Sequence, residues 1–197
     1  VVAIILVVAA IKSSKPKRDP NIDMIGNSVI ADLDLNRVDT VIVAGAASTT
    51  TIERGEHGWT IKEKHGYPAD FEKVRANVIE LAELKVADVI DLPPAEHARL
   101  GIGEPSAERD AKKITLKGGG NVLGALILGK EHTKQSAAAE GYGGYPDGRY
   151  LMPAGGDHVF RVAKALTSYS DKPIDWVDTD LLNVSRSDLE ALAITGA

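Results

Sequence analysis

The sequence predicts an α+β fold in which antiparallel β-hairpins pack on one main amphipathic helix, accompanied by short helices and part of an N-terminal transmembrane helix. Three observations support this prediction. Strand-like runs recur in pairs around turn residues, one segment repeats apolar residues every three or four positions, and residues 1–11 are continuously apolar. Strands joined mainly by hairpins indicate an antiparallel sheet rather than alternating βαβ units.

The composition is that of an ordinary globular protein. The chain has 197 residues, of which 44% are hydrophobic and 26% are charged, and this length suits one large or two small domains. A formal net charge of -5 argues against a nucleic-acid partner, because such binding requires a basic surface. The absence of cysteine excludes disulfides, thiolate metal sites and cysteine nucleophiles. We expect no cofactor.

The apolar N-terminal segment indicates where the protein is located. A bilayer span needs about 20 apolar residues, so residues 1–11 predict part of a transmembrane helix, with a signal-peptide tail and a buried strand as alternatives. Residues 12–36 are interpreted as a juxtamembrane linker. The cations between Lys12 and Arg18 would favour a cytoplasmic domain by the positive-inside rule, which conflicts with export. The candidate contacts with lipid and with partner subunits are Val1, Ile4, Ile5, Leu6, Val8 and Ile11.

A strand and a hairpin are predicted after the linker. Residues 38–45 are predicted to form a strand, since valine and isoleucine favour strands. Residues 49–53 and 58–63 alternate polar and apolar side chains, and Arg54 to Gly58 supplies a turn between them. Tyr67 to Asp70 should then end the strand region and begin a helix, because proline and aspartate both suit a first helical turn.

One main helix is predicted after Asp70. Apolar residues recur at helical spacing over about 16 residues and would form a single stripe, made of Phe71, Val74, Val78, Leu81 and Leu84. A short helix over 95–100 should stop at Gly101, since glycine commonly ends helices. A last short helix is expected over 173–183.

Two further hairpins and a long loop are predicted in the second half of the chain. The hairpins cover 114–128, with a glycine turn, and 149–162. The loop between them is predicted over 131–148, and loops of this length are usually functional. Tyr142 and Tyr145 lie in it among glycines, a composition that suits contact with another protein.

The domain boundaries follow from these elements. We expect an α+β domain over 37–186. Residues 184–196 loosely repeat the pattern of residues 35–45, in which a polar step with Arg and Asp leads into an apolar run that ends at glycine. Residues 187–197 are therefore interpreted as the start of a second repeat, with chance or a capped helix start as the alternatives.

The sequence contains no convincing catalytic motif. Gly124 to Lys130 fits G-x-x-x-x-G-K but continues with glutamate where a P-loop needs serine or threonine, so we interpret it as a strand. The five histidines form no metal-binding pair, and His132 beside Glu131 is interpreted as surface polarity. The carboxylates around Trp176 are interpreted as anions at a helix start, with cation binding as the alternative; they are Asp175, Asp178 and Asp180.

Several short motifs together resemble a known family. They are, in chain order, Trp59-Thr60-Ile61, Tyr67-Pro68-Ala69-Asp70, Leu100-Gly101-Ile102, Leu126-Ile127-Leu128-Gly129-Lys130, Gly148-Arg149-Tyr150-Leu151 and Trp176-Val177-Asp178. Over residues 38–195 this order resembles the bacterial domain of unknown function 4340 family. The resemblance implies a single-span, membrane-anchored protein with an extracytoplasmic α+β domain, in a family partly associated with gliding-type ABC-transporter auxiliary components. The family has no established catalytic residues, so the resemblance assigns none here.

We therefore expect a non-enzymatic, membrane-anchored accessory or scaffold subunit of a larger membrane complex. Residues 1–11 would hold it in the inner (cytoplasmic) membrane by a single pass, with the globular domain outside the cytoplasm. Its partners would be other membrane protein subunits. The alternative is an auxiliary component of an ABC-type transport system that binds a polysaccharide, lipid or peptide. That alternative requires a concave apolar pocket between helix 70–85 and the sheet.

Overall fold

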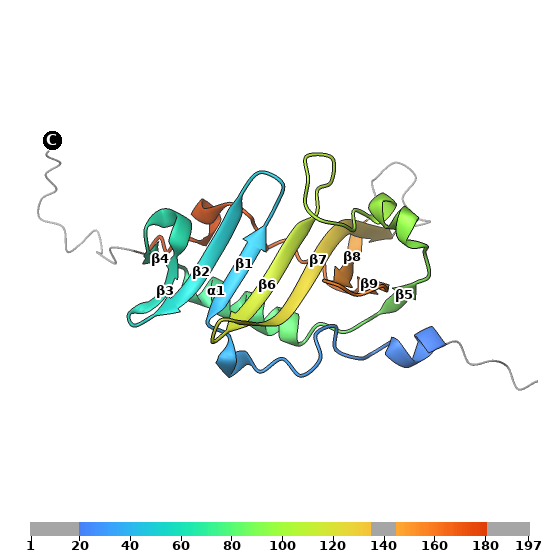
Figure 1. The fold of residues 1–197 in the computed structure, drawn as a ribbon, viewed down its shortest axis with the longest axis horizontal. Coiled ribbons are helices and arrows are strands. Elements are labelled where there is room, and N and C mark those ends of the chain that lie inside the picture. Colours follow the sequence, from blue (N-terminus) through green and yellow to red (C-terminus); the bar gives the residue numbers. More distant parts are fainter. Residues whose placement is uncertain (1–19, 135–144, 181–197) are drawn as a thin grey trace, which may run out of the picture.

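The computed structural model describes residues 20–134 and 145–180, and its centre is a single antiparallel sheet (Figure 1). Nine strands of the described residues lie in the order β4-β3-β2-β1-β6-β7-β8-β9-β5. The predicted α+β class is therefore confirmed. The strands are β1 (Thr40–Ala44), β2 (Thr49–Gly55), β3 (Gly58–Ile61), β4 (Tyr67–Pro68), β5 (Asp88–Ile90), β6 (Lys112–Gly118), β7 (Asn121–Lys134), β8 (Tyr145–Pro153) and β9 (Val159–Val162).

The helical elements are one α-helix and several short 3-10 helices. α1 (Phe71–Ala82) lies behind the sheet in the view of Figure 1. The 3-10 helices are η1 (Pro20–Met24), η2 (Leu35–Arg37), η3 (Lys62–Lys64), η4 (Pro94–Leu100) and η5 (Pro173–Trp176). The predicted stop of the short helix at Gly101 is confirmed, because this glycine adopts the left-handed conformation with φ 72°.

All three predicted hairpins are confirmed by strand pairing. β2 and β3 close at Gly55 and Gly58, and β6 and β7 close at Gly118 and Asn121. β8 and β9 pair around Leu151. Each hairpin could be found locally because its turn residues and its alternating apolar residues lie close together in the sequence.

α1 begins where the sequence predicts. The carboxylate of Asp70 accepts a hydrogen bond from the backbone N–H of Lys73 at 3.0 Å and caps the helix. The helix ends at Ala82 and is therefore shorter than predicted. Phe71 is 53% exposed, so the predicted stripe reaches the core only from Val74 onward. Phe71 stands in the first turn, before the helix reaches the sheet.

The main core fills the space between α1 and one face of the sheet. Its side chains come from the predicted stripe and from alternate positions of the strands, as the twofold repeat of a strand requires. Central members that are at most 1% exposed are Val41, Val43, Ile52, Val74, Leu81, Ile114, Leu116, Leu126, Leu128 and Leu151. The pocket that the transport alternative requires at this position is therefore occupied by packed side chains.

A smaller apolar cluster lies on the opposite face. Ile127 alternates with Leu126 and Leu128 along β7, so its side chain points away from α1. It is buried, as are Ile102 and Val159, and all three lie outside the main core. η4 covers this region: a Cβ on Gly129 would lie 2.3 Å from the carbonyl oxygen of Leu100.

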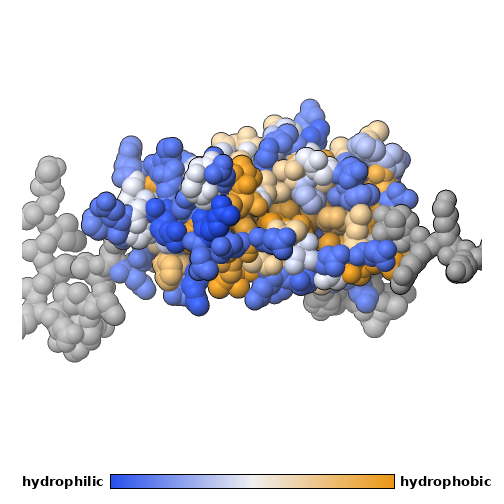
Figure 2. Space-filling model, turned by 60° about the horizontal axis from the view of Figure 1, so that its bottom comes forward, coloured by the Kyte–Doolittle hydropathy of each residue, from blue (hydrophilic) through white to orange (hydrophobic). Residues whose placement is uncertain are grey.

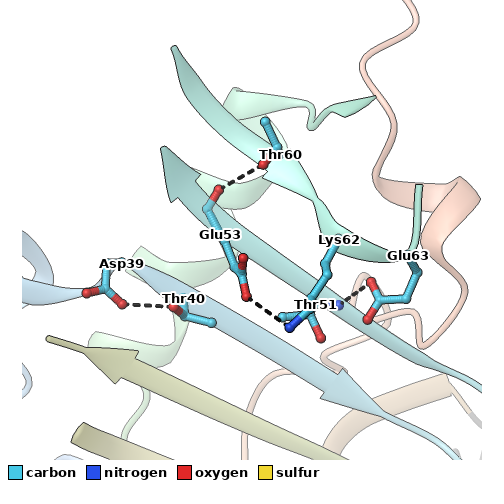
Figure 3. A network of polar contacts seen from close by, with 7 residues as sticks. All are labelled: Asp39, Thr40, Thr51, Glu53, Thr60, Lys62 and Glu63. Atoms are coloured by element: carbon cyan, nitrogen blue, oxygen red, sulfur yellow. Dashed lines mark hydrogen bonds and ion pairs between the residues drawn. The ribbon is translucent and has the colours of Figure 1, made fainter. Parts of the chain in front are cut away.

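Over β1, β2 and β3 the same face carries a polar network, which Figure 3 shows. Glu63 accepts a hydrogen bond from the backbone N–H of Thr51 at 2.8 Å, beyond the end of β3. Lys62 lies 3.8 Å from Glu53. Asp39 accepts from Thr40 Oγ1 and from the backbone N–H of Gly119. The Gly119 bond, the stronger cause, and the Thr40 bond hold the pKa of Asp39 below its usual value.

The segment before β1 lies along the lower edge of the molecule and packs onto it (Figures 1 and 2). Val29 and Ile30 are buried in the main core. The backbone N–H groups of Gly26 and Val29 donate to the carbonyl oxygens of Val86 and Leu84 at 2.8 and 2.9 Å. The part of the predicted linker after Pro20 is thus attached to the domain. Figure 2 also shows hydrophobic surface exposed among hydrophilic groups on this side.

The last described segment closes the β4 edge. The backbone N–H of Asp70 donates to the carbonyl oxygen of Trp176, and Ala69 forms a bridge with Val177. The helix predicted over 173–183 is wrong in length, because η5 ends at Trp176 and the backbone of Val177 is extended; residues 181–183 lie outside the described residues. Asp175 lies in the first turn of η5, as predicted, and accepts from Ser170 at 2.5 Å. Asp178 and Asp180 follow this helix, so their interpretation as anions at a helix start is wrong.

Candidate functional site: the β7–β8 arm

The candidate site is a two-stranded arm that projects beyond the sheet. β7 pairs with β6 only as far as Leu128, and β8 pairs with β9 only from Arg149 onward. Beyond these points β7 and β8 continue to pair with each other, up to Lys134 and Tyr145. We call residues 131–134 and 145–148 the arm. The predicted loop over 131–148 is therefore wrong, because both of its ends are strand.

A side-chain pair holds the two strands of the arm together. His132 Nδ1 contacts Asp147 Oδ1 across the ribbon, and about a third of each side chain remains exposed. The ring of Tyr150 meets the His132 ring edge-on, with centroids 5.6 Å apart. The hydrogen bond from His132 holds the pKa of Asp147 below its ordinary value, against an opposing effect of desolvation.

This pair predicts an acid-dependent loss of stability. Because the pKa of Asp147 is lowered in the folded protein, its contribution is present above the ordinary value of 3.8 and is lost as the pH falls through the folded value. Asp147→Asn should therefore destabilise the protein near neutral pH, and its difference from the wild type should shrink below about pH 4. Urea denaturation across the pH range measures this. Asp91→Asn, at an exposed position, is the control; a difference for Asp147→Asn that does not depend on pH would contradict the prediction.

Arg149 anchors the base of the arm. Its Nε donates to the carbonyl oxygen of Gly129 at 2.8 Å, and its Nη1 donates to those of Ala165 and Leu166 at 3.0 and 2.9 Å. Glu131 lies 4.0 Å away, and the Arg149 side chain is only 11% exposed. Burial lowers the pKa of Arg149, but arginine remains charged in proteins. One side chain thus connects β8 to β7 and to the segment after β9.

Two glycines allow this close packing. Gly129 lies against the Leu100 carbonyl, and a Cβ on Gly148 would lie 2.1 Å from the carbonyl oxygen of Val162. Contacts this short with backbone cannot be relieved by turning a side chain. The base of the arm therefore requires glycine at these two positions.

Gly148→Ala is expected to lower the free energy of unfolding by about 1–3 kcal/mol, because β9 must move to accommodate the methyl group. Urea denaturation of the full chain measures this change. Gly55→Ala is the matched control, since a Cβ there would have its nearest neighbour at 3.8 Å. Equal effects of the two substitutions would show that the contact with Val162 is not the cause.

The predicted contact residues lie at or beyond the tip of the arm, or at the N-terminus. Tyr145 is the first residue of β8 and pairs with Lys134. Tyr142 lies outside the described residues, as do Val1, Ile4, Ile5, Leu6, Val8 and Ile11. Within residues 20–134 and 145–180, no helix is both long and apolar enough to cross a bilayer.

Sequence reasoning missed the residues that build the arm. The interpretation of His132 as surface polarity does not include its contact with Asp147. Arg149 belongs to one of the family motifs, but nothing in the sequence indicates that it anchors the arm. The ribbon contains no apolar alternation, so hydrophobic periodicity could not reveal it. The interpretation of Gly124 to Lys130 as strand is confirmed, because β7 contains all of it. In the described part of the chain, no three histidine or acidic side chains are grouped to hold a metal ion.

The fold and the arm define the class of protein: an α+β domain with one antiparallel sheet, one covering helix and a projecting two-stranded ribbon. The chain belongs to the family described as Domain of unknown function (DUF4340), whose model matches residues 59–197. The family resemblance seen in the sequence is thus confirmed. No curated protein and no solved structure gives a significant match.

Proposed function

We propose that this chain is a non-enzymatic, membrane-anchored accessory subunit that binds a partner subunit of a larger membrane complex through the β7–β8 arm. Residues 1–11 would be the tether in the inner membrane, and the domain would lie on its extracytoplasmic side. The observation that carries the proposal is the arm itself, which continues beyond both neighbouring strands while its base is tightly held.

The arm offers a partner two strand edges. Among the described strands, none pairs with β7 beyond Leu128 on its β6 side, and none pairs with β8 before Arg149 on its β9 side. Backbone N–H and C=O groups on such edges can add a strand from another protein. Charged residues and proline protect exposed edges from unspecific pairing. The arm carries Glu131, Lys134 and Pro146, and Lys130 directly precedes it.

The base of the arm favours binding because it is preorganised. The three hydrogen bonds of Arg149 and the contact between His132 and Asp147 fix the direction of the ribbon before any partner arrives. Less conformational entropy is then lost on association than for an unstructured loop. A preorganised ribbon suits a scaffold that must hold its partner in one orientation.

Site-specific photo-crosslinking tests the docking proposal. The photoreactive residue p-benzoylphenylalanine is placed at Thr133, which is exposed on the arm, or at Glu56, which is exposed in the β2–β3 turn. The full chain is irradiated in native membranes. We expect one discrete adduct from Thr133, identified by mass spectrometry as an integral membrane protein, and none from Glu56. Identical adducts from both positions, or none from either, would contradict docking through the arm.

The tether and the orientation require a separate test. Carbonate extraction should leave the full chain in the membrane, and protease added outside spheroplasts should digest the domain. Release of the chain by carbonate would contradict a membrane-spanning tether. Protection of the domain from protease would place it in the cytoplasm, as the positive-inside rule alone suggests.

A further inference from the structure

A groove along the outer flank of α1 has features of a ligand site. This groove is separate from the arm. It has a volume of about 780 Å³, within the range of small-molecule sites. One wall follows the helix from Lys73 to Glu83, and the other wall is formed by Ala163, Lys164 and Ser168. It lies beside α1, not between α1 and the sheet.

The charge of the groove is opposite to that of the chain as a whole. Four cationic side chains line it, Lys73, Arg75, Lys85 and Lys164, against the carboxylates of Glu80 and Glu83, whereas the chain has a net charge of -5. Glu80 already accepts a hydrogen bond from the hydroxyl of Tyr169 at 3.1 Å. Positive charge concentrated in a concave site attracts anions.

The cations differ in how far they are engaged. Lys73 contacts the carbonyl oxygen of Asp175, and Lys85 donates to Ser28 at 2.8 Å. Arg75 forms only an exposed pair with Glu72 at 3.4 Å, and exposed pairs of this kind are weak. Lys164 is exposed and has no ion pair with the described residues. Arg75 and Lys164 can therefore turn to an incoming anion.

The wall between the two sides contains an unsatisfied donor. Asn77 is 5% exposed, and its Oδ1 accepts a hydrogen bond from Ser168 at 2.6 Å. Its Nδ2 is buried and has no acceptor in the described structure. A buried donor without a partner destabilises the folded protein. An oxyanion bound in the groove against Asn77 Nδ2 would supply the missing acceptor.

The remaining lining is apolar, from Ala76, Ile79, Leu84 and Ala163. We infer that this groove binds an anionic amphiphile, with a phosphate-type head at Arg75, Lys164 and Asn77 and an aliphatic body along the apolar lining. Arginine and lysine recognise phosphate through charge-assisted hydrogen bonds. This inference is independent of the proposed docking through the arm, because no residue of β7 or β8 lines the groove.

Calorimetry on the full chain in zwitterionic nanodiscs tests the inference with three probes: octyl phosphate, inorganic phosphate and octyl glucoside. Octyl phosphate should bind saturably, at least about tenfold more tightly than either of the others. Arg75→Ala with Lys164→Ala should weaken octyl phosphate binding about tenfold or more. The matched control is Arg37→Ala with Lys64→Ala, which removes the same charge at exposed positions elsewhere and should leave the affinity within about twofold.

Several results would overturn the inference. No saturable binding of octyl phosphate would do so, as would equal weakening by the control pair. If octyl glucoside bound as tightly as octyl phosphate, the groove would not require an anionic head. If inorganic phosphate bound as tightly, the groove would not require an aliphatic body. None of these results depends on the photo-crosslinks of the arm, so the two proposals can fail separately.

Discussion

Replacing Trp176 with alanine is expected to lower the free energy of unfolding by about 3–5 kcal/mol. The Trp176 side chain is fully buried, and its indole N–H donates to the carbonyl oxygen of Ser170 at 2.7 Å. Lys73 Nζ lies 5.1 Å from the centre of the ring. Alanine would leave a cavity and a carbonyl without its donor, next to the capped start of α1.

Urea denaturation of the full chain in one zwitterionic detergent measures this loss. Ile174→Ala is the matched control, because Ile174 lies in the same 3-10 helix and is 61% exposed. We expect the control to change the free energy of unfolding by less than about 0.5 kcal/mol. A loss below about 1 kcal/mol for Trp176→Ala would mean that η5 does not contribute to the core as the packing indicates.

Arg149→Met is expected to lower the free energy of unfolding by about 3 kcal/mol, because three hydrogen bonds from a charged group to backbone carbonyls are lost. Methionine retains most of the aliphatic volume, so packing changes little. The loss should be concentrated at the arm, whose anchor is removed. The amides of residues 131–134, 147 and 148 should exchange with solvent faster, while those of β1 and β6 should change little.

Hydrogen exchange by mass spectrometry, combined with urea denaturation, separates these effects. Lys130→Met is the control, since Lys130 lies on the neighbouring strand β7, directly before the arm, and is exposed. The control should alter neither measurement. Uniformly faster exchange throughout the sheet, or unchanged exchange in the arm, would contradict an anchoring role for Arg149. If exchange in the arm were unchanged, the yield of the crosslink from Thr133 should also be unchanged by Arg149→Met.

Much of the fold could be predicted because its signals are local. The turns at Gly55–Gly58 and Gly118–Asn121 lie beside their strands, and Asp70 lies beside the helix that it caps. The apolar repeat of α1 is contained within the helix itself. Predictions failed at element ends, where Phe71 is exposed and where η5 stops at Trp176. At such positions the path of the neighbouring chain decides whether a helix continues.

The sequence could predict where the candidate site lies along the chain, but not its structure. Glycines and tyrosines marked the region around residues 131–148, but its ribbon is polar on both faces. Its order comes from His132 with Asp147 and from Arg149 with Ala165 and Leu166. These contacts join residues 15 to 17 positions apart, and no repeat in the sequence indicates them.

The sequence by itself determined the α+β class, the three hairpins, the capped helix and the family, because each depends on neighbouring residues or on an ordered set of short motifs. Only the tertiary structure decided the strand order, the projecting arm and the groove beside α1. Strand order depends on which buried faces fit together across long separations, and the groove combines a helix flank with a segment about 80 residues further along the chain. Such pairings are determined by packing in three dimensions.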